Sequence, residues 1–220
     1  MFAGGQIALT ARLRQHLASL NHAYVVAADS GAHTALELGF RPDLVIGDMD
    51  SIDVHTLRRL EAAGVSLERH PRDKDATDGE LAVERALDTG VQHVVLVGFL
   101  GGPRFDQELA SILLLTRLSV DAVLLDGGNE CRVVRPGQPA EWLPEPGEIV
   151  SLVPLDDAGG VRTHGLRWPL EGDRLPRGST RGVSNEPNGE RVGVSIEHGV
   201  LLLSRYFPGD RPPQGAASAD

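Results

Sequence analysis

Cysteine is almost absent from this sequence. Cys131 is the single cysteine in 220 residues, so the chain cannot form an internal disulfide. This usage fits a reducing cytosol, and we interpret Cys131 as a small buried apolar residue rather than a nucleophile. Long apolar runs are also missing, and Arg12 and Arg14 interrupt the N-terminal segment. Neither a membrane-spanning helix nor a signal peptide is therefore expected, and we predict a soluble, cytoplasmic protein without a membrane partner.

Excess positive charge is missing as well. The chain has 21 Lys and Arg residues against 31 Asp and Glu residues, which gives a formal net charge of -10. A nucleic-acid-binding surface is therefore not expected, although a local cation or a metal can still hold an anionic ligand. The eight histidines include neither a His-Glu-x-x-His motif nor a pair at zinc-site spacing. For Trp142 and Trp168 we expect core or interface positions, with stacking on a heteroaromatic ligand as the alternative.

The first part of the chain alternates between apolar strands and amphipathic helices. Short apolar runs predict buried strands, and segments with helical spacing follow them, several of which stop at a glycine. The predicted strands lie at 24–28, 44–46, 65–67, 93–97 and 122–125, with a short first strand at 2–3. This order predicts an α/β fold with a parallel, Rossmann-like sheet flanked by helices, in which ligands bind at the carboxyl ends of the strands.

After about Arg135 the pattern changes. Prolines interrupt short segments, and alternation replaces helical spacing. Val192, Val194 and Ile196 share one face of a predicted strand, the run 200–203 predicts another, and Gly199 indicates a tight hairpin between them. We therefore predict an α/β domain at 1–134, a smaller antiparallel β-sandwich domain at 135–207, and a disordered tail at 208–220 that is rich in Pro, Gly, Ala and Ser.

The segment Gly47-Asp48-Met49-Asp50-Ser51 places two carboxylates directly after a buried strand. Ionised aspartates are rarely buried unless they are paired or metal-bound, so this pair predicts a metal and phosphate site at the mouth of the strand. An ordinary Asx-rich turn explains the same residues when they are taken alone. The rest of the chain favours the site, because Asp29, Gly98 and Asp126 also follow predicted strands directly, at the same edge of the sheet.

A second charged stretch, Pro71 to Glu80, leads into a predicted helix. Thr77 and Glu80 have the spacing of a capping box, which places Asp78 in the first helical turn. Exposed N–H groups and the helix dipole favour anions there. The simple alternative is that Asp78 only complements the dipole.

A glycine-rich turn, Gly98 to Gln107, lies between the strand at 93–97 and another predicted helix. Glycine lets the backbone approach a phosphate closely, and the Arg104 guanidinium can hold phosphate oxygens bidentately. The turn is neither a P-loop nor a dinucleotide-binding fingerprint, because the Lys-Ser/Thr pair and the GxGxxG spacing are absent. We expect Asp106 to cap the helix that follows.

Together these segments resemble thiamine pyrophosphokinases. The resemblance covers nearly the whole chain and depends on the order and spacing of several motifs. They are Asp29-Ser30-Gly31, Pro42-Asp43, Gly47 to Ser51, Lys74 to Glu80, Gly101 to Gln107, Gly165 to Leu170, Gly178-Ser179, Ser184-Asn185-Glu186 and Gly199 to Leu202. The family implies transfer of a diphosphate from ATP to the hydroxyethyl group of thiamine, with release of AMP and a requirement for Mg²⁺.

The resemblance also implies roles for individual residues. Asp48, Asp50 and Asp78 match the family's metal-binding positions, and Mg²⁺ prefers carboxylates together with phosphate oxygens. Asp106 would orient or deprotonate the thiamine hydroxyl, with Asp75 as the alternative. Contacts to the diphosphate or the nucleotide are implied for Asp29, Gly31, Lys74, Thr77, Arg104 and Gln107.

Members of the family are homodimers in which thiamine lies between the α/β domain of one subunit and the β domain of the other. The resemblance therefore implies a homodimer with its active site at the subunit interface, and it places Ser184 and Asn185 at the substrate.

The sequence departs from the family pattern at three side chains. Gln107 and Ser111 stand where many bacterial members carry His and Asn, and Leu202 stands where some members carry a tryptophan near thiamine. Trp168 and Tyr206 are therefore the alternatives for an aromatic residue that stacks on the substrate.

Three other functions are alternatives to this one. Haloacid dehalogenase-like phosphatases also carry Asp-x-Asp after an apolar strand, but their downstream Lys and Asp-Asp pair are absent here. A diphosphokinase of the same fold that acts on another alcohol, such as a hydroxymethylpterin, is disfavoured by the thiamine-like second domain. A catalytically silent thiamine- or nucleotide-binding module is disfavoured by three nearby carboxylates, which repel one another unless a cation joins them.

Overall fold

The computed structural model describes residues 1–20 and 23–208, and its internal contacts divide the chain into two compact units, Met1–Asp126 and Gly127–Asp220. Of the predicted tail, residues 209–220 lie outside the described part. The division falls before β6 (Asn129–Val134), whereas the boundary predicted from the sequence falls at its end. In the described residues, no helix is long and apolar enough to cross a membrane.

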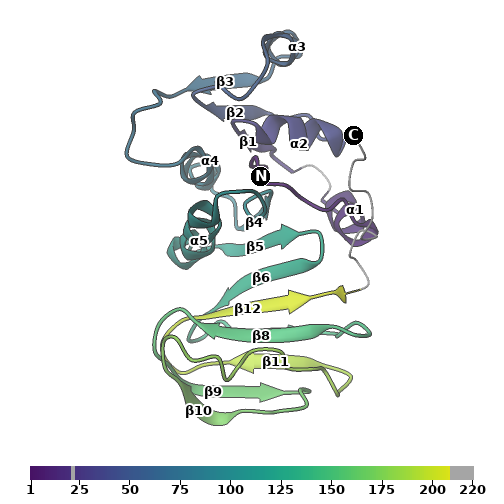
Figure 1. The fold of residues 1–220 in the computed structure, drawn as a ribbon, viewed down its shortest axis with the longest axis vertical. Coiled ribbons are helices and arrows are strands. Elements are labelled where there is room, and N and C mark those ends of the chain that lie inside the picture. The colour runs from purple at the N-terminus through teal and green to yellow at the C-terminus, as the bar shows by residue number, and fades with distance from the viewer. Residues whose placement is uncertain (21–22, 209–220) are drawn as a thin grey trace. The chain divides into compact units, whose positions relative to one another are not determined.

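The first unit is a parallel sheet with helices on both faces, as predicted (Figure 1). The strands pair in the order β3-β2-β1 and as β4-β5, and the backbone of Phe2 bridges β1 and β4 in place of a full first strand. The bounds are β1 (Val26–Ala28), β2 (Leu44–Gly47), β3 (Ser66–Arg69), β4 (His93–Val97) and β5 (Asp121–Asp126).

Alternation along the strands sends side chains into two apolar clusters, one on each face of this sheet. Ala27 and Val45 pack on the side of α1, α2 and α3, whereas Val26 and Ile46 pack on the side of α4. The helices are α1 (Ala11–Ala18), α2 (Gly31–Glu37), α3 (Val54–Ala62), α4 (Asp78–Leu87) and α5 (Phe105–Leu114), followed by the 3₁₀ helix η1 (Leu115–Arg117).

The starts of α4 and α5 differ in how far they follow the sequence prediction. Thr77 caps α4 as predicted, because its Oγ1 accepts a hydrogen bond from the Glu80 N–H at 3.1 Å. The prediction that Asp106 caps α5 is wrong: Arg104 occupies the N-cap position and Asp106 lies in the first turn. The Asp106 carboxylate binds the Arg104 guanidinium through two charge-assisted hydrogen bonds.

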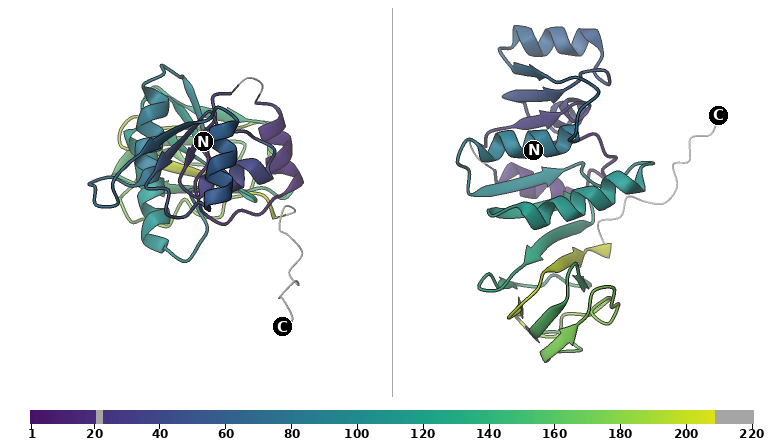
Figure 2. Two further views of the ribbon diagram at one scale, coloured as in Figure 1. Left: turned by 90° about the horizontal axis from the view of Figure 1, so that it is seen from above. Right: turned by 90° about the vertical axis from the view of Figure 1, so that its left-hand side faces the viewer.

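The second unit consists of two antiparallel sheets around one apolar core, as predicted (Figure 2). One sheet has the order β10-β9-β11-β7, and the other contains β6-β12-β8. Val150 and Leu201 from one sheet meet Val161 and Val192 from the other in this core. Besides β6, the strands are β7 (Ala140–Trp142), β8 (Ile149–Pro154), β9 (Ala158–His164), β10 (Glu171–Leu175), β11 (Val192–Ser195) and β12 (Leu201–Tyr206).

The hairpin predicted at Gly199 is not formed. β11 pairs with β7 and β9, whereas β12 pairs with β6 and β8, so the chain crosses from one sheet to the other at Gly199. Gly199 has φ +86, and a Cβ there would lie 2.1 Å from the Asp157 carbonyl oxygen. The periodicity predicted the buried faces of both strands correctly. It could not show that the two strands belong to different sheets, because strands on opposite sides of one core have the same pattern of buried residues.

Trp142 lies partly buried against the core of the second unit, as expected. Its Nε1 donates a hydrogen bond to Glu148 Oε1 at 2.8 Å. Arg205 donates to both oxygens of the same carboxylate at 2.8 and 3.0 Å, and its guanidinium carbon lies 5.0 Å from the Trp142 ring centroid. Trp142 is thus used in a buried polar cluster of the fold.

Candidate functional site

The carboxyl ends of β1, β2 and β4 open onto a cavity of about 980 Å³ in the first unit. Asp29, Asp48 and Gly98, each of which follows a strand directly, line this cavity. Asp126, which was expected to follow a strand, is the last residue of β5 and is not among the lining residues. Strand ends that are far apart in the sequence therefore meet at one place. Other sequence-predicted site residues that line the cavity are Lys74, Thr77, Asp78, Arg104 and Gln107.

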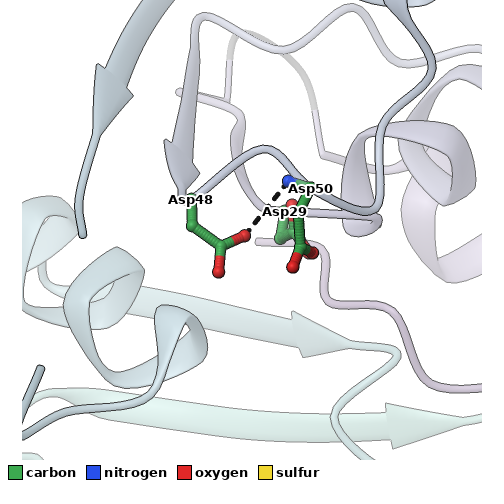
Figure 3. Close-up of side chains that lie close together, drawn as sticks. All are labelled: Asp29, Asp48 and Asp50. Carbon is green, nitrogen blue, oxygen red and sulfur yellow. Dashed lines mark hydrogen bonds between the residues drawn. The ribbon is translucent and has the colours of Figure 1, made fainter. Parts of the chain in front are cut away.

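Three carboxylates gather at the turn that follows β2 (Figure 3). Asp29, Asp48 and Asp50 each offer an oxygen, and these oxygens lie within 4.8 Å of one another. The Asp50 N–H donates to Asp48 Oδ1 at 3.1 Å, and this hydrogen bond is the main cause of the lowered pKa of Asp48. Among the described residues, the buried Oδ1 of Asp29 has no hydrogen-bond partner. A buried carboxylate oxygen of this kind fits a bound cation.

Gly47 lets Asp78 approach this cluster from α4. Gly47 has φ +149, and a Cβ there would lie 3.0 Å from Asp78 Oδ1 and 3.1 Å from the Asp29 Cβ. A side chain at this position would therefore push the two aspartates apart. Asp78 Oδ1 is also buried without a hydrogen-bond partner in the described structure, and burial raises the pKa of Asp78, with added repulsion from Asp29 and Asp48.

Lys74 is a cation that faces this group. Its Nζ lies 3.3 Å from Asp78 Oδ1, close enough for an ion pair although not aligned as a hydrogen bond, and it donates to the Pro71 carbonyl oxygen at 3.0 Å. The Lys74 side chain is only 14% exposed. The ion pair is therefore partly shielded from solvent, and its charges interact more strongly than those of a pair at an open surface.

Two glycine turns meet in the wall of the cavity. The Gly5 N–H donates to the Gly98 carbonyl oxygen at 2.8 Å, and the Gln6 N–H donates to the Gly101 carbonyl oxygen at 3.3 Å. A Cβ on Gly5 would lie 2.1 Å from the Leu100 carbonyl oxygen, so the two backbones touch directly. Sequence reasoning did not find this pairing, because no local pattern connects turns that are so far apart in the chain.

Arg104 and Asp106 bind each other at the start of α5. Arg104 donates from Nε to Asp106 Oδ1 at 2.8 Å and from Nη2 to Oδ2 at 2.5 Å. This contact lowers the pKa of Asp106 to about 2. A carboxylate with so low a pKa is ionised throughout the neutral range and is a weak base. Asp106 is not among the residues that line the cavity, whereas Arg104 is.

The remaining predicted residues divide between the cavity and the frame around it. Gly31 does not line the cavity, and a Cβ on it would lie 2.3 Å from the Phe2 carbonyl oxygen, so this glycine serves close packing. Asp75 is exposed and is also not a lining residue. Lining residues that sequence reasoning missed include Ser51, Arg72 and Arg117. Ser51 and Arg72 stand within the two stretches that the sequence singled out, but they were given no role, and nothing in the sequence around Arg117 indicated a site.

Ser184 and Asn185 lie in the second unit, beside Trp168. Asn185 Nδ2 donates to the Trp168 carbonyl oxygen at 2.7 Å, and Asn185 Oδ1 accepts from the Trp168 N–H at 3.1 Å. Ser184 has φ +61, an uncommon backbone conformation for a residue with a side chain, and its N–H donates to Ser151 Oγ at 3.1 Å. The second pair of predicted residues thus belongs to a tightly held loop.

Comparison with known proteins gives two matching family models. The catalytic domain of thiamin pyrophosphokinase matches residues 15–124, and the vitamin B1 binding domain of thiamin pyrophosphokinase matches residues 141–201. The thiamine pyrophosphokinase of Bacillus subtilis (strain 168) is 30% identical over 188 residues, which are 84% of this chain and 87% of that relative.

Solved structures are similar over most of the chain. A crystal structure of thiamine pyrophosphokinase from Bacillus subtilis matches with a TM-score of 0.82 and 26% identity, covering 94% of this chain and 97% of the other. Thiamin pyrophosphokinase from Candida albicans has the same fold, with a TM-score of 0.75 at 17% identity, covering 94% of this chain and 88% of that one.

Proposed function

This chain belongs to the thiamin pyrophosphokinase family, and we propose that it transfers a diphosphate group from ATP to the hydroxyethyl oxygen of thiamine. The observation that carries the proposal is the cluster of Asp29, Asp48 and Asp50, of which Asp29 and Asp48 line the cavity and Asp50 does not. Buried oxygens of Asp29 and Asp78 lack hydrogen-bond partners in the described structure. Four carboxylates so close together repel one another unless a cation joins them.

The donor set fits Mg²⁺, which binds through carboxylate oxygens and keeps sites for phosphate oxygens and water. Asp48 and Asp50 would hold it together with Asp29, and Asp78 would complete the acidic site from the start of α4. When bound, Mg²⁺ supplies neutralisation of the charge on the ATP phosphates. The family resemblance set Asp29 on the nucleotide side; its place beside Asp48 and Asp50 is the reason that we now assign it to the metal.

The reaction joins the thiamine hydroxyl oxygen to the β-phosphorus of ATP and breaks the bond from that phosphorus to the bridging oxygen that leaves with AMP. The hydroxyl proton passes to a base. Phosphoryl-type transfer of this kind needs positioning and charge neutralisation more than covalent help from the protein. Lys74 and Arg104 line the cavity as cations for the diphosphate oxygens, and Thr77 and Gln107 lie beside them at the starts of two helices, where N–H groups favour anions.

We assign Asp106 a positioning role instead of the role of general base. Its carboxylate uses the Nε and Nη2 groups of Arg104 and leaves the remaining guanidinium N–H groups for phosphate. Asp106→Asn should therefore lower kcat/KM by less than about tenfold, mainly by raising the KM for ATP, because the guanidinium charge stays in place. Because the pKa of Asp106 is about 2, the pH profile of kcat between roughly pH 6 and 9 should keep its shape in this variant. Loss of a limb of that profile would instead make Asp106 the base.

The assembly that we propose is a homodimer in which thiamine lies between the acidic cavity of one subunit and the second unit of its partner. The match to a vitamin B1 binding domain at residues 141–201 supports a thiamine site on the second unit, separate in sequence from the acidic residues. Mixing an Asp48→Asn variant with a Ser184→Trp variant, each expected to have strongly reduced turnover alone, should raise turnover after subunit exchange, because one site of each mixed dimer is intact. Light scattering that gives a monomer, or mixtures that stay inactive after exchange, would count against the shared site.

The proposed activity is tested by incubating the protein with ATP, Mg²⁺ and thiamine and separating the nucleotide products. AMP and thiamine diphosphate in equal amounts are the expected products, and chelation of the metal should abolish both. ADP with thiamine monophosphate would indicate transfer of a single phosphoryl group, and inorganic phosphate alone would indicate a phosphatase. A hydroxymethylpterin offered in place of thiamine should give no AMP; efficient AMP formation from it would move the proposal to a different alcohol.

A further inference from the structure

Arg117 is a cation in the wall of the cavity that the proposed reaction does not use. It lies in η1, directly after α5, and its side chain is 62% exposed. Its Nη1 donates a hydrogen bond to Glu80 Oε1 in the first turn of α4, and its Nη2 lies 3.8 Å from Glu84 Oε1, one turn further along. Arg117 therefore connects the end of α5 to α4, the helix next to it in Figure 1.

Glu80 forms only half of the capping box that its spacing from Thr77 predicts. In a complete box the N-cap hydroxyl accepts from the N–H of the third helical residue, and the carboxylate of that residue accepts from the N-cap N–H. The first of these hydrogen bonds is present, from the Glu80 N–H to Thr77 Oγ1 at 3.1 Å. The second is absent from the described structure, and the Glu80 carboxylate binds Arg117 instead.

The start of α4 is therefore left with three backbone N–H groups that donate to no group in the described part of the chain. They belong to Thr77, Asp78 and Gly79, and all three residues line the cavity. In the same turn Asp78 Oδ1 is buried without a hydrogen-bond partner, and Lys74 Nζ lies 3.3 Å from it. The first N–H groups of a helix favour anions, so these groups are available to the diphosphate that the proposed function places in this cavity.

The Glu80 carboxylate competes for the same place when nothing else binds it. A Glu three residues after a Thr N-cap is the pattern of a capping box, so without Arg117 the carboxylate is expected to rotate toward the Thr77 N–H. It would then occupy one donor and bring a negative charge to the helix end that favours the phosphates. The guanidinium of Arg117 offers the carboxylate a full positive charge as an alternative partner.

The backbone that carries Arg117 is held by the interior of the first unit. Leu115 and Leu118, on either side of it, are 1% and 4% exposed. The Leu118 N–H donates to the Leu115 carbonyl oxygen at 3.3 Å, and Thr116 Oγ1 donates to the Leu113 carbonyl oxygen at 2.7 Å. The guanidinium is thus presented to α4 from a fixed support.

We propose that Arg117 is a positioning residue, which holds the Glu80 carboxylate away from the N-terminus of α4 and so keeps the first N–H groups of this helix available to the diphosphate of ATP. The inference rests on the proposed function, because the anion that it concerns is the phosphate chain of the nucleotide. Arg117 acts through Glu80 and needs no contact with the nucleotide itself.

The test is a calorimetric titration of the full-length protein with Mg²⁺ and the α,β-methylene analogue of ATP, which cannot be cleaved where AMP leaves. Arg117→Met should weaken binding by about tenfold, because a negative charge moves to the helix end and one N–H is lost to the phosphates. Adding Glu80→Ala to this variant should restore the affinity, because alanine has no carboxylate. In turnover, Arg117→Met should raise the KM for ATP and leave kcat and the KM for thiamine near their wild-type values.

Two other roles of Arg117 give different results in the same titration. If Arg117 bound the phosphates directly, Glu80→Ala would not restore the affinity of Arg117→Met. If the ion pair only tied α4 to α5, Glu80→Ala alone would weaken binding as much as Arg117→Met does, whereas the proposed role predicts that it binds at least as tightly as the wild-type protein. Either result, or unchanged affinity in Arg117→Met, would overturn the inference.

Arg85→Met is the matched control. Arg85 also pairs with an acidic residue, Glu68 of β3, through hydrogen bonds of 2.8 and 2.6 Å, and it lies on α4 but does not line the cavity. Its loss removes the same charge, so the analogue should bind as it does to the wild-type protein, and melting temperatures show whether each variant is folded. An equal loss of affinity in Arg85→Met would reveal a general effect of charge and would contradict the positioning role.

Failure of this inference is distinct from failure of the proposed function. A wild-type protein that neither binds the analogue nor forms AMP from ATP and thiamine would contradict the proposed function itself. Normal turnover in the wild-type protein, together with normal affinity and a normal KM for ATP in Arg117→Met, would contradict the role of Arg117 alone.

Discussion

Asp48→Asn should lower turnover with ATP, Mg²⁺ and thiamine by about 10²-fold or more, by analogy with the loss of one preorganised electrostatic contact. Asparagine keeps the size of the side chain and an Oδ1 that can still accept from the Asp50 N–H, so the turn after β2 should be preserved. The change removes one negative charge from the cluster formed with Asp29 and Asp50. The rate of AMP formation at saturating substrates measures the effect, and the melting temperature shows whether the fold is intact.

Asp53→Asn is the matched control for this variant. Asp53 caps α3 a few residues after the cluster, its side chain is 57% exposed, and it does not line the cavity. Asparagine is as good a helix cap as aspartate, so stability and turnover should stay near wild-type values. Mn²⁺ binding to the nucleotide-free protein, followed by electron paramagnetic resonance, should weaken in Asp48→Asn and not in Asp53→Asn. Normal turnover and normal Mn²⁺ affinity in Asp48→Asn would remove this residue from the metal site.

The position of the cavity could be predicted from the sequence because it follows from the geometry of a parallel sheet. Asp29, Asp48 and Gly98 each come directly after an apolar run, and parallel strands place such residues at one edge whatever the details of the packing. Thr77 could be assigned as a cap because the cap depends on residues three apart in the chain. Structure that depends only on residues close together in the chain can be predicted from the sequence, because no distant group takes part in it.

The features that escaped prediction depend on partners that are distant in the chain or compete locally. Asp106 was expected to cap α5, but its carboxylate accepts two hydrogen bonds from the neighbouring Arg104 guanidinium. The contacts between the Asn185 amide and the Trp168 backbone also escaped prediction, because periodicity does not reveal them; the substrate role predicted for Asn185 stays a prediction. The grouping of Asp29 with Asp48 and Asp50 depends on the glycine at position 47 and on the register of β1 and β2.

Lys74→Met should change two measurements in opposite directions. Turnover should fall by about 10²-fold, because the variant lacks a cation that we place at the diphosphate oxygens. The affinity of the nucleotide-free protein for Mn²⁺ should rise by about threefold to tenfold. The positive charge of Lys74 Nζ, 3.3 Å from Asp78 Oδ1, repels an incoming metal ion in the wild-type protein, and the variant lacks that charge. Methionine matches the length and apolar stem of lysine, so the packing of this mostly buried side chain should change little.

Arg72→Met provides the comparison, because Arg72 also faces the acidic cluster but from the solvent. Its Nη1 lies 3.8 Å from Asp50 Oδ2, and its side chain is 87% exposed, so water and salt screen its charge. Both turnover and Mn²⁺ affinity should change much less in Arg72→Met than in Lys74→Met. A fall of Mn²⁺ affinity in Lys74→Met would mean that Lys74 holds Asp78 in place for the metal. A rise of Mn²⁺ affinity together with lost turnover would mean that Lys74 neutralises the negative charge of the acidic site before the metal and the nucleotide bind. Lys74 would then bind the phosphate oxygens of the nucleotide.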